Sequence, residues 1–465
     1  MVEHGTVEVT RLAAAFGPRF EDVAVRDGRL YSNKAPGTAL LTLPAHAAAR
    51  LLTDEMRPTL TAMRLAGATL PVLLLGFGFL RFAERRGIEP ERARTVLFML
   101  LFATPLFAYG LLMFGHALTA AALFGAWLCL DERRDWLAGV LMGMAVASEY
   151  TAVFAAAVLI VSVAASRDWK RLLRVVSGGF PFAVLLGAYH HAAFGGAFRN
   201  PYSFSRNTQF RELIDSGVFG LHLPSPVTAL QIFLHPTYGL LVLSPVLIVA
   251  MAALPAARKS LSAPGWWTLV ALPAVLLVVY AGYPYWYGGW NVGPRFLVPA
   301  LPFLVIPLLF RSGSPIEAAL AGASVAVVAL TTLVFPFVPE AFGLPWGSLA
   351  IPLLREGLIG PNLLHLVSKP AAVIAPFAIV LLAAVLALPR WRLAALTGAA
   401  LALLIGATWA WFAPDPLIPL QRAYIAEVYF EHHGALEKAT AGRVPPGLIR
   451  RRAMELPLPP GSWPF

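Results

Sequence analysis

Residues 283–304 read Y-P-Y-W-Y-G-G-W-N-V-G-P-R-F-L-V-P-A-L-P-F-L, an aromatic, glycine-rich loop that carries one arginine into an apolar segment. An arginine at membrane depth is costly and is usually kept for an anionic partner such as a phosphate. The glycines let a ligand approach the backbone, and Trp and Tyr rings suit a membrane–water boundary. The stretch therefore predicts a membrane protein whose Arg295 meets a lipid bearing a phosphate and a sugar.

The composition supports a protein embedded in a membrane. Of the 465 residues, 58% are hydrophobic and 13% are charged, with a mean hydropathy of +0.69. This is typical of helical integral membrane proteins and excludes a soluble domain. The net charge of +11 does not indicate a nucleic-acid partner, because the basic residues lie mostly in short loops between apolar runs. The single cysteine, Cys129, excludes an intrachain disulfide and a cysteine-based metal site.

Apolar runs of about the length that crosses a bilayer occur along most of the chain. We expect spans near residues 60–80, 94–112, 115–130, 175–193, 237–254, 267–283, 296–310, 317–337, 371–388 and 393–412. The run 136–165 lies between two basic loops, so it is expected to cross out and back as two short helices. The predicted fold class is all-α, a polytopic transmembrane helical protein of about 12 spans.

The distribution of Lys and Arg predicts the topology. These residues are denser in the short loops, which the positive-inside rule places in the cytoplasm. Residues 1–57 then form an outer loop with an interfacial helix, 58–412 the transmembrane helical domain, and 413–465 an outer tail. We expect this tail to be partly helical around 421–439 and loosely packed. Long connections gathered on one face indicate that function resides there.

The first outer loop contains D-G-R-L-Y-S-N-K-A-P-G-T-A-L-L-T-L-P-A-H, residues 27–46. Pro36 and Gly37 break the extended segment, and Thr38 begins a predicted helix over 38–52 that is too short to span. This helix is expected to lie in the membrane interface, which would hold Lys34 at the bilayer surface. The alternative is a solvated lysine followed by an ordinary amphipathic helix.

Polar residues at the outer ends of the spans are the other candidates. Glu149 lies in the expected hairpin turn, where a carboxylate is costly unless it is paired or hydrated, so it is either functional or a solvated tip. His116 begins a span and either takes part in the site or hydrogen-bonds a neighbouring helix. In the loop 195–235, Arg199 and Tyr202 are able to hydrogen-bond a phosphorylated or hydroxylated ligand, although ordinary polar loops contain the same residue types.

Four segments in order resemble motifs of the polytopic GT-C glycosyltransferases, whose bacterial members include lipid A aminoarabinose transferases and protein mannosyltransferases. They are Y-S-N-K-A-P-G-T-A-L-L, G-H-A-L-T-A-A-A-L-F, G-M-A-V-A-S-E-Y-T-A and W-Y-G-G-W-N-V-G-P-R-F-L-V-P-A-L-P-F-L, all within residues 1–310. The resemblance implies a sugar donor carried on a polyprenyl phosphate or diphosphate, used on the outer face of the bacterial inner membrane. It also implies an outer-loop carboxylate as base and basic residues that steady the leaving phosphate.

The resemblance assigns roles to particular residues. It makes Lys34 and Arg295 the first candidates for contact with the donor phosphate. The further candidates for substrate contact are Tyr31, His116, Arg199, Tyr202 and Trp290. Glu149 is the candidate second acidic residue. The family's first acidic motif follows an earlier transmembrane helix, and we expect that helix and its base to lie before Met1, or the chain to be inactive or to need another subunit. Asp27 and Glu21 are the nearby carboxylates that could replace the base.

Two other functions remain open at this point. A secondary transporter of about 12 spans would place charges and broken helices near the bilayer midplane, whereas the unusual residues here gather at one face. A catalytically inactive membrane subunit would fit the missing acidic motif. The sequence specifies neither the donor sugar nor the acceptor, which the resemblance allows to be a glycan, lipid or protein, and it leaves open an assisting divalent metal.

Overall fold

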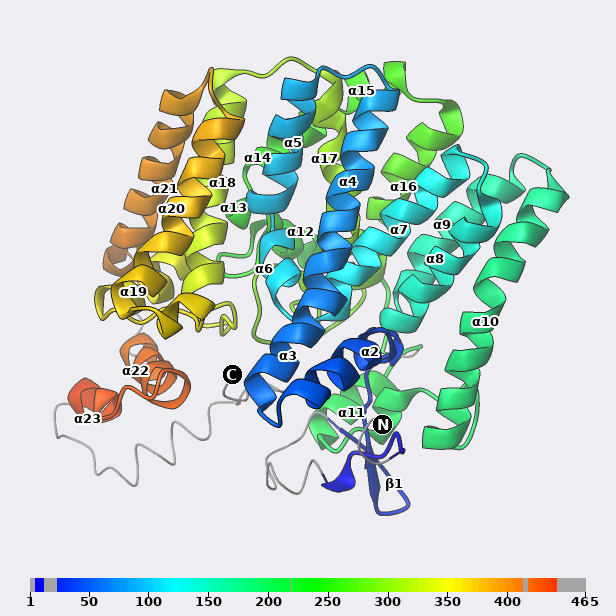
Figure 1. Ribbon diagram of the computed structural model, residues 1–465, viewed down its shortest axis with the longest axis horizontal. Helices are drawn as coiled ribbons and strands as arrows, with labels where there is room; N and C mark the ends of the chain where they lie inside the picture. The colour runs from blue at the N-terminus through cyan, green and yellow to red at the C-terminus, as the bar shows by residue number, and fades with distance from the viewer. Residues whose placement is uncertain (1–4, 12–22, 219, 413–416, 441–465) are drawn as a thin grey trace.

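The computed structural model describes residues 5–11, 23–218, 220–412 and 417–440. Long helices stand side by side, and their connections fall at two opposite ends of the molecule (Figure 1). One end carries short loops, such as those joining α4 to α5 and α20 to α21. The other end carries the long connections, the small β-sheet, α11 and the C-terminal helices. We call these ends the short-loop face and the long-loop face.

The elements before residue 200 are as follows. The strands are β1 (Ala24–Arg26) and β2 (Arg29–Tyr31). The helices are α2 (Gly37–Leu52), α3 (Met56–Arg64), η1 (Leu65–Thr69), α4 (Leu70–Arg85), α5 (Pro90–Phe102), α6 (Leu106–Leu111), α7 (Gly115–Asp131), α8 (Asp135–Ser148), α9 (Ala152–Ala164) and α10 (Trp169–Phe194).

The elements after residue 200 are shorter on average, because prolines interrupt many of them. They are η2 (Pro201–Phe204), α11 (Thr208–Asp215), α12 (Pro226–Leu234), α13 (Leu240–Leu243), α14 (Val246–Ala252), α15 (Leu254–Ser260), α16 (Ala263–Ala281), η3 (Arg295–Ala300), α17 (Leu301–Val305), η4 (Ile306–Phe310), α18 (Pro315–Val334), η5 (Trp346–Ala350), α19 (Ile351–Arg355), η6 (Leu363–Leu366), α20 (Lys369–Ala387), α21 (Arg392–Phe412), α22 (Leu417–Tyr429) and α23 (Ala435–Thr440).

The predicted fold class is confirmed. Within the described residues, six helices are long and apolar enough to cross a membrane, and α7, α8, α9 and the run 295–310 are shorter apolar helices. The expected hairpin over 136–165 is present as α8 and α9, which turn at residues 149–151. The expected span at 237–254 is broken into α13, α14 and the start of α15. Its breaks coincide with Pro245 and Pro255, which remove backbone donors.

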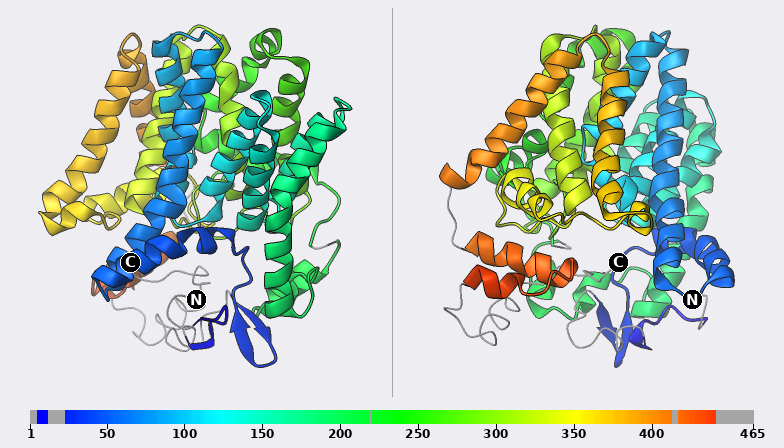
Figure 2. Two further views of the ribbon diagram at one scale, coloured as in Figure 1. Left: turned by 45° about the vertical axis from the view of Figure 1, so that its right-hand side comes forward. Right: turned by 60° about the vertical axis from the view of Figure 1, so that its left-hand side comes forward.

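Helix α2 begins at Gly37 and ends at Leu52, one residue longer than the predicted helix over 38–52. It lies across the lower ends of the upright helices and turns back into α3 (Figures 1 and 2). Thr38 and Thr42 are buried, whereas Leu51 and Leu52 are 88% and 87% exposed. The helix thus packs one face on the protein and leaves two leucines exposed at its end.

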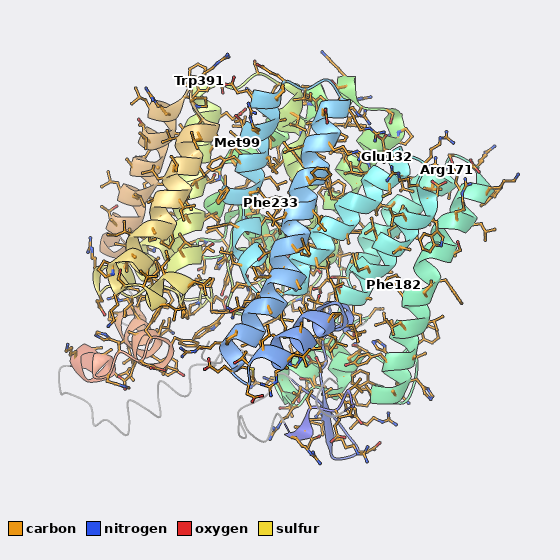
Figure 3. All side chains as sticks on the ribbon, viewed as in Figure 1. Met99, Glu132, Arg171, Phe182, Phe233 and Trp391 are labelled. Atoms are coloured by element: carbon orange, nitrogen blue, oxygen red, sulfur yellow. The ribbon has the colours of Figure 1, made fainter. Side chains whose placement is uncertain are left out.

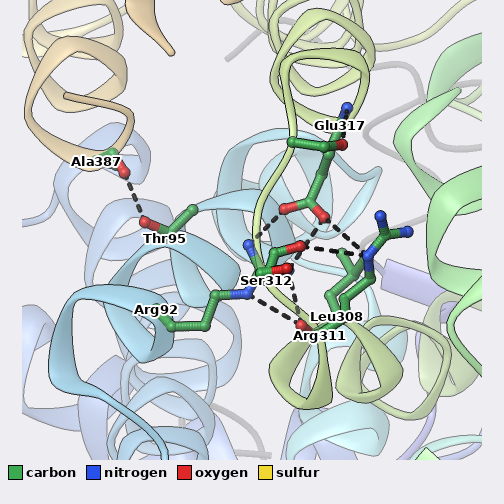
Figure 4. Close-up of polar contacts among 8 residues, drawn as sticks. Arg92, Thr95, Leu308, Arg311, Ser312, Glu317 and Ala387 are labelled. Carbon is green, nitrogen blue, oxygen red and sulfur yellow. Dashed lines mark hydrogen bonds and ion pairs between the residues drawn. The ribbon is translucent and has the colours of Figure 1, made fainter. Parts of the chain in front are cut away.

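Ion pairs with buried or partly buried carboxylates fasten the short-loop face. Arg92 of α5 reaches both the carboxylate of Glu317 and the carbonyl oxygen of Leu308 (Figure 4). In the α7–α10 region, Glu132 and Arg171 lie at the upper ends of their helices (Figure 3). The guanidinium of Arg171 donates to the buried carboxylate of Asp135 at 2.9 Å. These contacts join neighbouring helices where their connections are shortest.

The C-terminal helix α22 packs more closely than we predicted. We expected a loosely packed tail, but Ile425 of α22 is fully buried and Tyr429 contacts the ring of Phe335, with ring centroids 5.1 Å apart. The guanidinium of Arg422 donates to the carbonyl oxygen of Ser348 at 3.2 Å. The apolar residues of this helix therefore fasten it to the long-loop face. The proline-rich end after residue 440 lies outside the described residues.

Candidate functional site

A cavity of about 3390 Å³ opens at the long-loop face. Segments that are far apart in the sequence line it, including the loop before α2, the starts of α3 and α7, the α8–α9 turn, α10 and the loop before η3. Lys34 and Arg295 both lie in its wall, together with Glu149 and His116. Two basic residues singled out from the sequence, from segments far apart in the chain, thus line one cavity.

Two glycines bring the walls of this cavity together. A Cβ atom on Gly37, at the start of α2, would lie 2.5 Å from the backbone of Ala147 at the end of α8. A Cβ atom on Gly115, at the start of α7, would lie 2.6 Å from the carbonyl oxygen of Ser148. Because only glycine permits such close approach, three segments meet beside the α8–α9 turn. Lys34, His116 and Glu149 are adjacent to these contacts in the sequence.

The buried His116 pairs with the partly exposed Glu149. The Nδ1 atom of His116 lies 3.2 Å from Oε2 of Glu149. The His116 ring is 3% exposed, and the rings of Tyr109, Phe114 and Phe296 surround it at 5.4–6.0 Å between centroids. The aromatic box holds the imidazole in place, so one carboxylate oxygen of Glu149 is oriented by a fixed partner.

The environment of Glu149 favours the protonated form of its carboxyl group more than bulk water would. Burial raises the pKa of the Glu149 carboxyl to about 7, although the positive charges of Arg295 and Lys34 act in the opposite direction. Glu149 lies in the turn between α8 and α9, outside both helices. A carboxyl group with a pKa near neutrality is suited to take a proton from a substrate at physiological pH.

The loop before η3 holds Arg295 through its neighbours. The side chain of Asn291 donates to the carbonyl oxygen of Tyr287 at 2.7 Å, and the Tyr109 hydroxyl donates to the carbonyl oxygen of Val292 at 3.2 Å. A Cβ atom on Gly288 would lie 2.5 Å from Nε of Arg295, so glycine leaves room for the guanidinium. This Nε atom is buried and has no hydrogen-bond partner among the described residues.

Aromatic contacts connect Arg295 with the Glu149 turn. The guanidinium carbon of Arg295 lies 5.0 Å from the ring centroid of Phe296, which stacks on Tyr280 at 4.6 Å. The Tyr280 hydroxyl in turn hydrogen-bonds the Thr151 hydroxyl. A series of aromatic contacts thus connects Arg295 with Thr151, which lies in the same turn as Glu149.

Lys34 and His190 make further contacts around the cavity. The ammonium of Lys34 lies 5.3 Å from the ring centroid of Tyr202, a cation–π distance. Tyr150, beside Glu149, hydrogen-bonds His190 of α10 at 3.0 Å. His190 thereby connects α10 to the α8–α9 turn.

The other sequence candidates are placed in different ways. Arg199, Tyr202 and Trp290 line the cavity. Tyr31 does not, because it is 9% exposed and packs edge-on against Phe194, while the following Ser32 faces the cavity. Alternation of side chains along an extended strand accounts for this difference.

The two substitute carboxylates lie elsewhere. Asp27 sits in the β1–β2 turn with its side chain 80% exposed and an Arg26 partner at 3.2 Å. It is not among the cavity-lining residues. Glu21 lies outside the described residues. Glu149 is therefore the candidate carboxylate that the structure brings to Lys34 and Arg295.

Several cavity residues were not singled out from the sequence. Arg64 of α3 lines the cavity from within a membrane-crossing helix, and its position inside the predicted span 60–80 was a signal that could have found it. Tyr280 and Tyr283 also line the wall. Their type gave no signal, because tyrosines at span ends are common anchors.

Comparisons with known proteins returned little at the level of sequence. No family model matches the chain, and no curated protein matches it. A search of solved structures found the crystal structure of ArnT from Cupriavidus metallidurans bound to undecaprenyl phosphate. The match has 16% sequence identity and a TM-score of 0.49, and it covers 90% of this chain and 74% of that one.

ArnT belongs to the glycosyltransferase superfamily that the sequence motifs resemble. At 16% identity, the match concerns the fold and does not assign a function to this chain. Among the described residues, no group of three or more His, Cys, Asp or Glu side chains is placed to hold a metal ion.

Proposed function

We propose that the protein is a membrane glycosyltransferase that moves a sugar from a polyprenyl-phosphate-linked donor to an acceptor hydroxyl. The observation that carries this proposal is the shared cavity of Lys34, Arg295 and Glu149. Two cations suit the donor phosphate, and a carboxylate of near-neutral pKa suits the acceptor proton. The motif resemblance and the undecaprenyl phosphate bound to ArnT point to the same class of donor.

In the proposed reaction, the acceptor oxygen attacks the anomeric carbon of the sugar while Glu149 accepts the hydroxyl proton. The bond between the anomeric carbon and the phosphate oxygen breaks, and its electron pair stays on the phosphate. Lys34 and Arg295 stabilise the negative charge that develops there. His116 holds Glu149 at 3.2 Å, so the carboxylate does not turn toward the cations. Attack opposite the leaving phosphate inverts the anomeric carbon.

The positive-inside rule supports an outward-facing site. The connections α4–α5, α7–α8 and α15–α16 at the short-loop face contain Arg86, Arg133, Arg134 and Lys259 or lie beside them. Loops of this kind are retained in the cytoplasm. The cavity lies at the opposite face and would open to the periplasm or exterior of the bacterial inner membrane.

Binding of the lipid phosphate tests the proposal without knowledge of the sugar. The purified full chain in lipid nanodiscs should bind undecaprenyl phosphate and not undecaprenol. Lys34→Ala and Arg295→Ala should each weaken binding about 10-fold to 100-fold, because a charge-assisted hydrogen bond contributes about 1.5–3 kcal/mol. Lys259→Ala on the short-loop face is the matched control and should bind like the unchanged protein.

Transfer is tested with ¹⁴C-labelled hexoses and pentoses on polyprenyl phosphate, incubated with membranes as the source of acceptor. Label should leave the donor only with active protein present. Equal binding of undecaprenyl phosphate and undecaprenol, or no loss in both cation variants, would refute the proposed donor. Binding without transfer of any sugar in the panel would instead support an inactive subunit, and movement of the intact donor across a vesicle membrane would support a transporter.

A further inference from the structure

The cavity has an apolar end on each side of the charged residues. One end is lined by Leu40 and Leu43 of α2 and by Leu60 and Met63 of α3. The other end is lined by apolar residues of α9 and α10, namely Phe154, Phe180, Ala183, Val184 and Gly187. Helices α3 and α10 stand apart in Figure 1 and in the left-hand view of Figure 2, so the two sets of lining residues come from separate parts of the bundle.

Glycines explain why the second end opens where it does. A Cβ atom on Gly139 of α8 would lie 1.9 Å from the carbonyl oxygen of Val175, so α8 and α10 touch through their backbones there. One turn further toward the long-loop face, Gly143 receives the ring of Phe182, which Figure 3 shows beside α8 and α10. Beyond this contact, Val146 of α8 and Val184 of α10 both line the cavity.

The second end opens beside the middle part of α10, a helix that is long and apolar enough to cross a membrane. Val184 precedes the end of α10 at Phe194 by ten residues, about 15 Å along the helix at 1.5 Å per residue. Phe180 and Val184 are 63% and 53% exposed on a helix that crosses the membrane. A molecule that enters between α9 and α10 therefore comes from the bilayer and brings a hydrocarbon chain with it.

The polar groups at the two ends differ in kind. The α9–α10 end leads to Glu149, Thr151 and the Tyr150–His190 hydrogen bond, which suit a hydroxyl group. The α2–α3 end leads to Lys34, which precedes α2, and carries Arg64 in its own wall. A phosphate is favoured beside the cations and an attacking hydroxyl beside the carboxylate.

From this arrangement we infer that the acceptor is a membrane lipid with a hydroxylated headgroup, whose hydrocarbon chain enters between α9 and α10. The donor chain occupies the opposite end, between α2 and α3. This inference rests on the proposed glycosyl transfer and adds the class of acceptor. A protein or a soluble glycan would need no apolar passage from the bilayer to Glu149.

Two neighbouring residues of α10 provide a matched test. Val184→Trp fills the α9–α10 end, whereas Leu185→Trp adds the same ring to a residue that is 44% exposed and does not line the cavity. Transfer from labelled donor to an envelope extract should fall more than 10-fold in Val184→Trp and less than 2-fold in Leu185→Trp. Undecaprenyl phosphate should bind both variants with unchanged affinity, which also shows that both are folded.

The opposite end gives the reciprocal pair. Leu60→Trp should weaken undecaprenyl phosphate binding more than 10-fold, whereas Leu65→Trp, at an exposed residue outside the cavity wall, should not. Loss of donor binding in Val184→Trp together with retention in Leu60→Trp would show that the donor occupies the α9–α10 end, and would overturn the assignment.

The fate of the label separates this inference from the proposed function. The envelope extract is divided into lipid, protein and water-soluble fractions, and each is offered as acceptor. Label that appears in the lipid fraction, in a product distinct from the donor, supports a lipid acceptor. Label in protein or in the water-soluble fraction would overturn the acceptor class while leaving glycosyl transfer intact. Unchanged donor with every fraction would refute both proposals.

Discussion

Arg92 with Glu317, and His116 with Glu149, are two pairs of a basic residue and a carboxylate at opposite ends of the helices, and their surroundings differ. Arg92 also donates twice to the carbonyl oxygen of Leu308, and the Glu317 carboxylate receives both terminal nitrogens of the guanidinium (Figure 4). Both charges of this pair thus have protein partners. Glu149 instead has one histidine partner and faces a large cavity.

We interpret this difference as the one between a structural ion pair and the ligand-binding pair that we propose. A fully hydrogen-bonded buried pair fixes the helices that carry it, and removing one partner leaves an unpaired charge. A carboxylate that faces a cavity beside cations keeps the capacity to bind something else. We therefore expect substitutions at the short-loop face to change stability and substitutions at the cavity to change activity.

The largest expected effect is on catalysis at Glu149. Glu149→Gln keeps the shape of the side chain and removes the base, so transfer should fall about 10²-fold to 10⁴-fold, the range typical of general base catalysis. The thermal unfolding temperature should be unchanged, because glutamine has the shape of glutamate and the replaced carboxylate was poorly solvated. Asp27→Asn, at the exposed β1–β2 turn, is the control and should retain full transfer. Equal loss in both variants would contradict the distinction between them.

The next effect is on stability at the opposite face. Arg92→Ala leaves Glu317 buried without its main partner and should lower the free energy of unfolding by about 3–5 kcal/mol. Chemical unfolding in detergent measures this loss. The double variant Arg92→Met with Glu317→Leu should recover most of it, since a buried pair replaced by apolar groups is often neutral. If the Arg92→Ala protein is folded but no longer binds undecaprenyl phosphate, the separation between stability at the short-loop face and ligand binding at the cavity would be contradicted.

The pH dependence of transfer tests the same comparison without a substitution. Because the pKa of Glu149 is raised to about 7, its carboxyl is mostly ionised at pH 8 and mostly protonated at pH 6. The base form is lost as the pH falls, so kcat/KM should drop roughly 10-fold between pH 8 and pH 6. A profile that stays flat down to pH 5 would show that Glu149 titrates in its ordinary range or takes no part in transfer.

The smallest effect is expected at Gly37, which positions Lys34. Gly37→Ala places a methyl group 2.5 Å from the Ala147 backbone and should shift the start of α2. Undecaprenyl phosphate affinity should fall several-fold, and stability should change little because α2 lies at the edge of the bundle. Gly76→Ala is the control, since its added methyl meets only Leu97 at an ordinary 3.5 Å. Identical affinities would show that Lys34 is positioned independently of this contact.

Much of the architecture was predictable from local patterns. The long apolar runs marked the membrane-crossing helices, and Pro36 with Gly37 marked the start of α2 to within one residue. The turn at Glu149 followed from two basic loops flanking one apolar run. These features depend on residues close together in the sequence, where helix length and charge distribution act directly.

Other features required the packed structure. No local pattern pairs His116 with Glu149 rather than with another polar residue, because backbone contacts at Gly37 and Gly115 create that proximity. Tyr31 and Lys34 belong to one motif, yet the geometry of the strand directs the Tyr31 side chain toward a small apolar cluster outside the cavity. Helix α22 was predicted to be loosely packed, but its Ile425 is fully buried against the rest of the fold.

The amino-acid sequence by itself determined that this protein is helical, embedded in a membrane and asymmetric in charge, because hydrophobicity and basic loops act through the bilayer without tertiary contacts. Only the tertiary structure decided which polar residues meet. Close backbone approach at particular glycines joins α2, α7 and α8, and that packing brings a lysine, an arginine and a carboxylate from distant segments into one cavity.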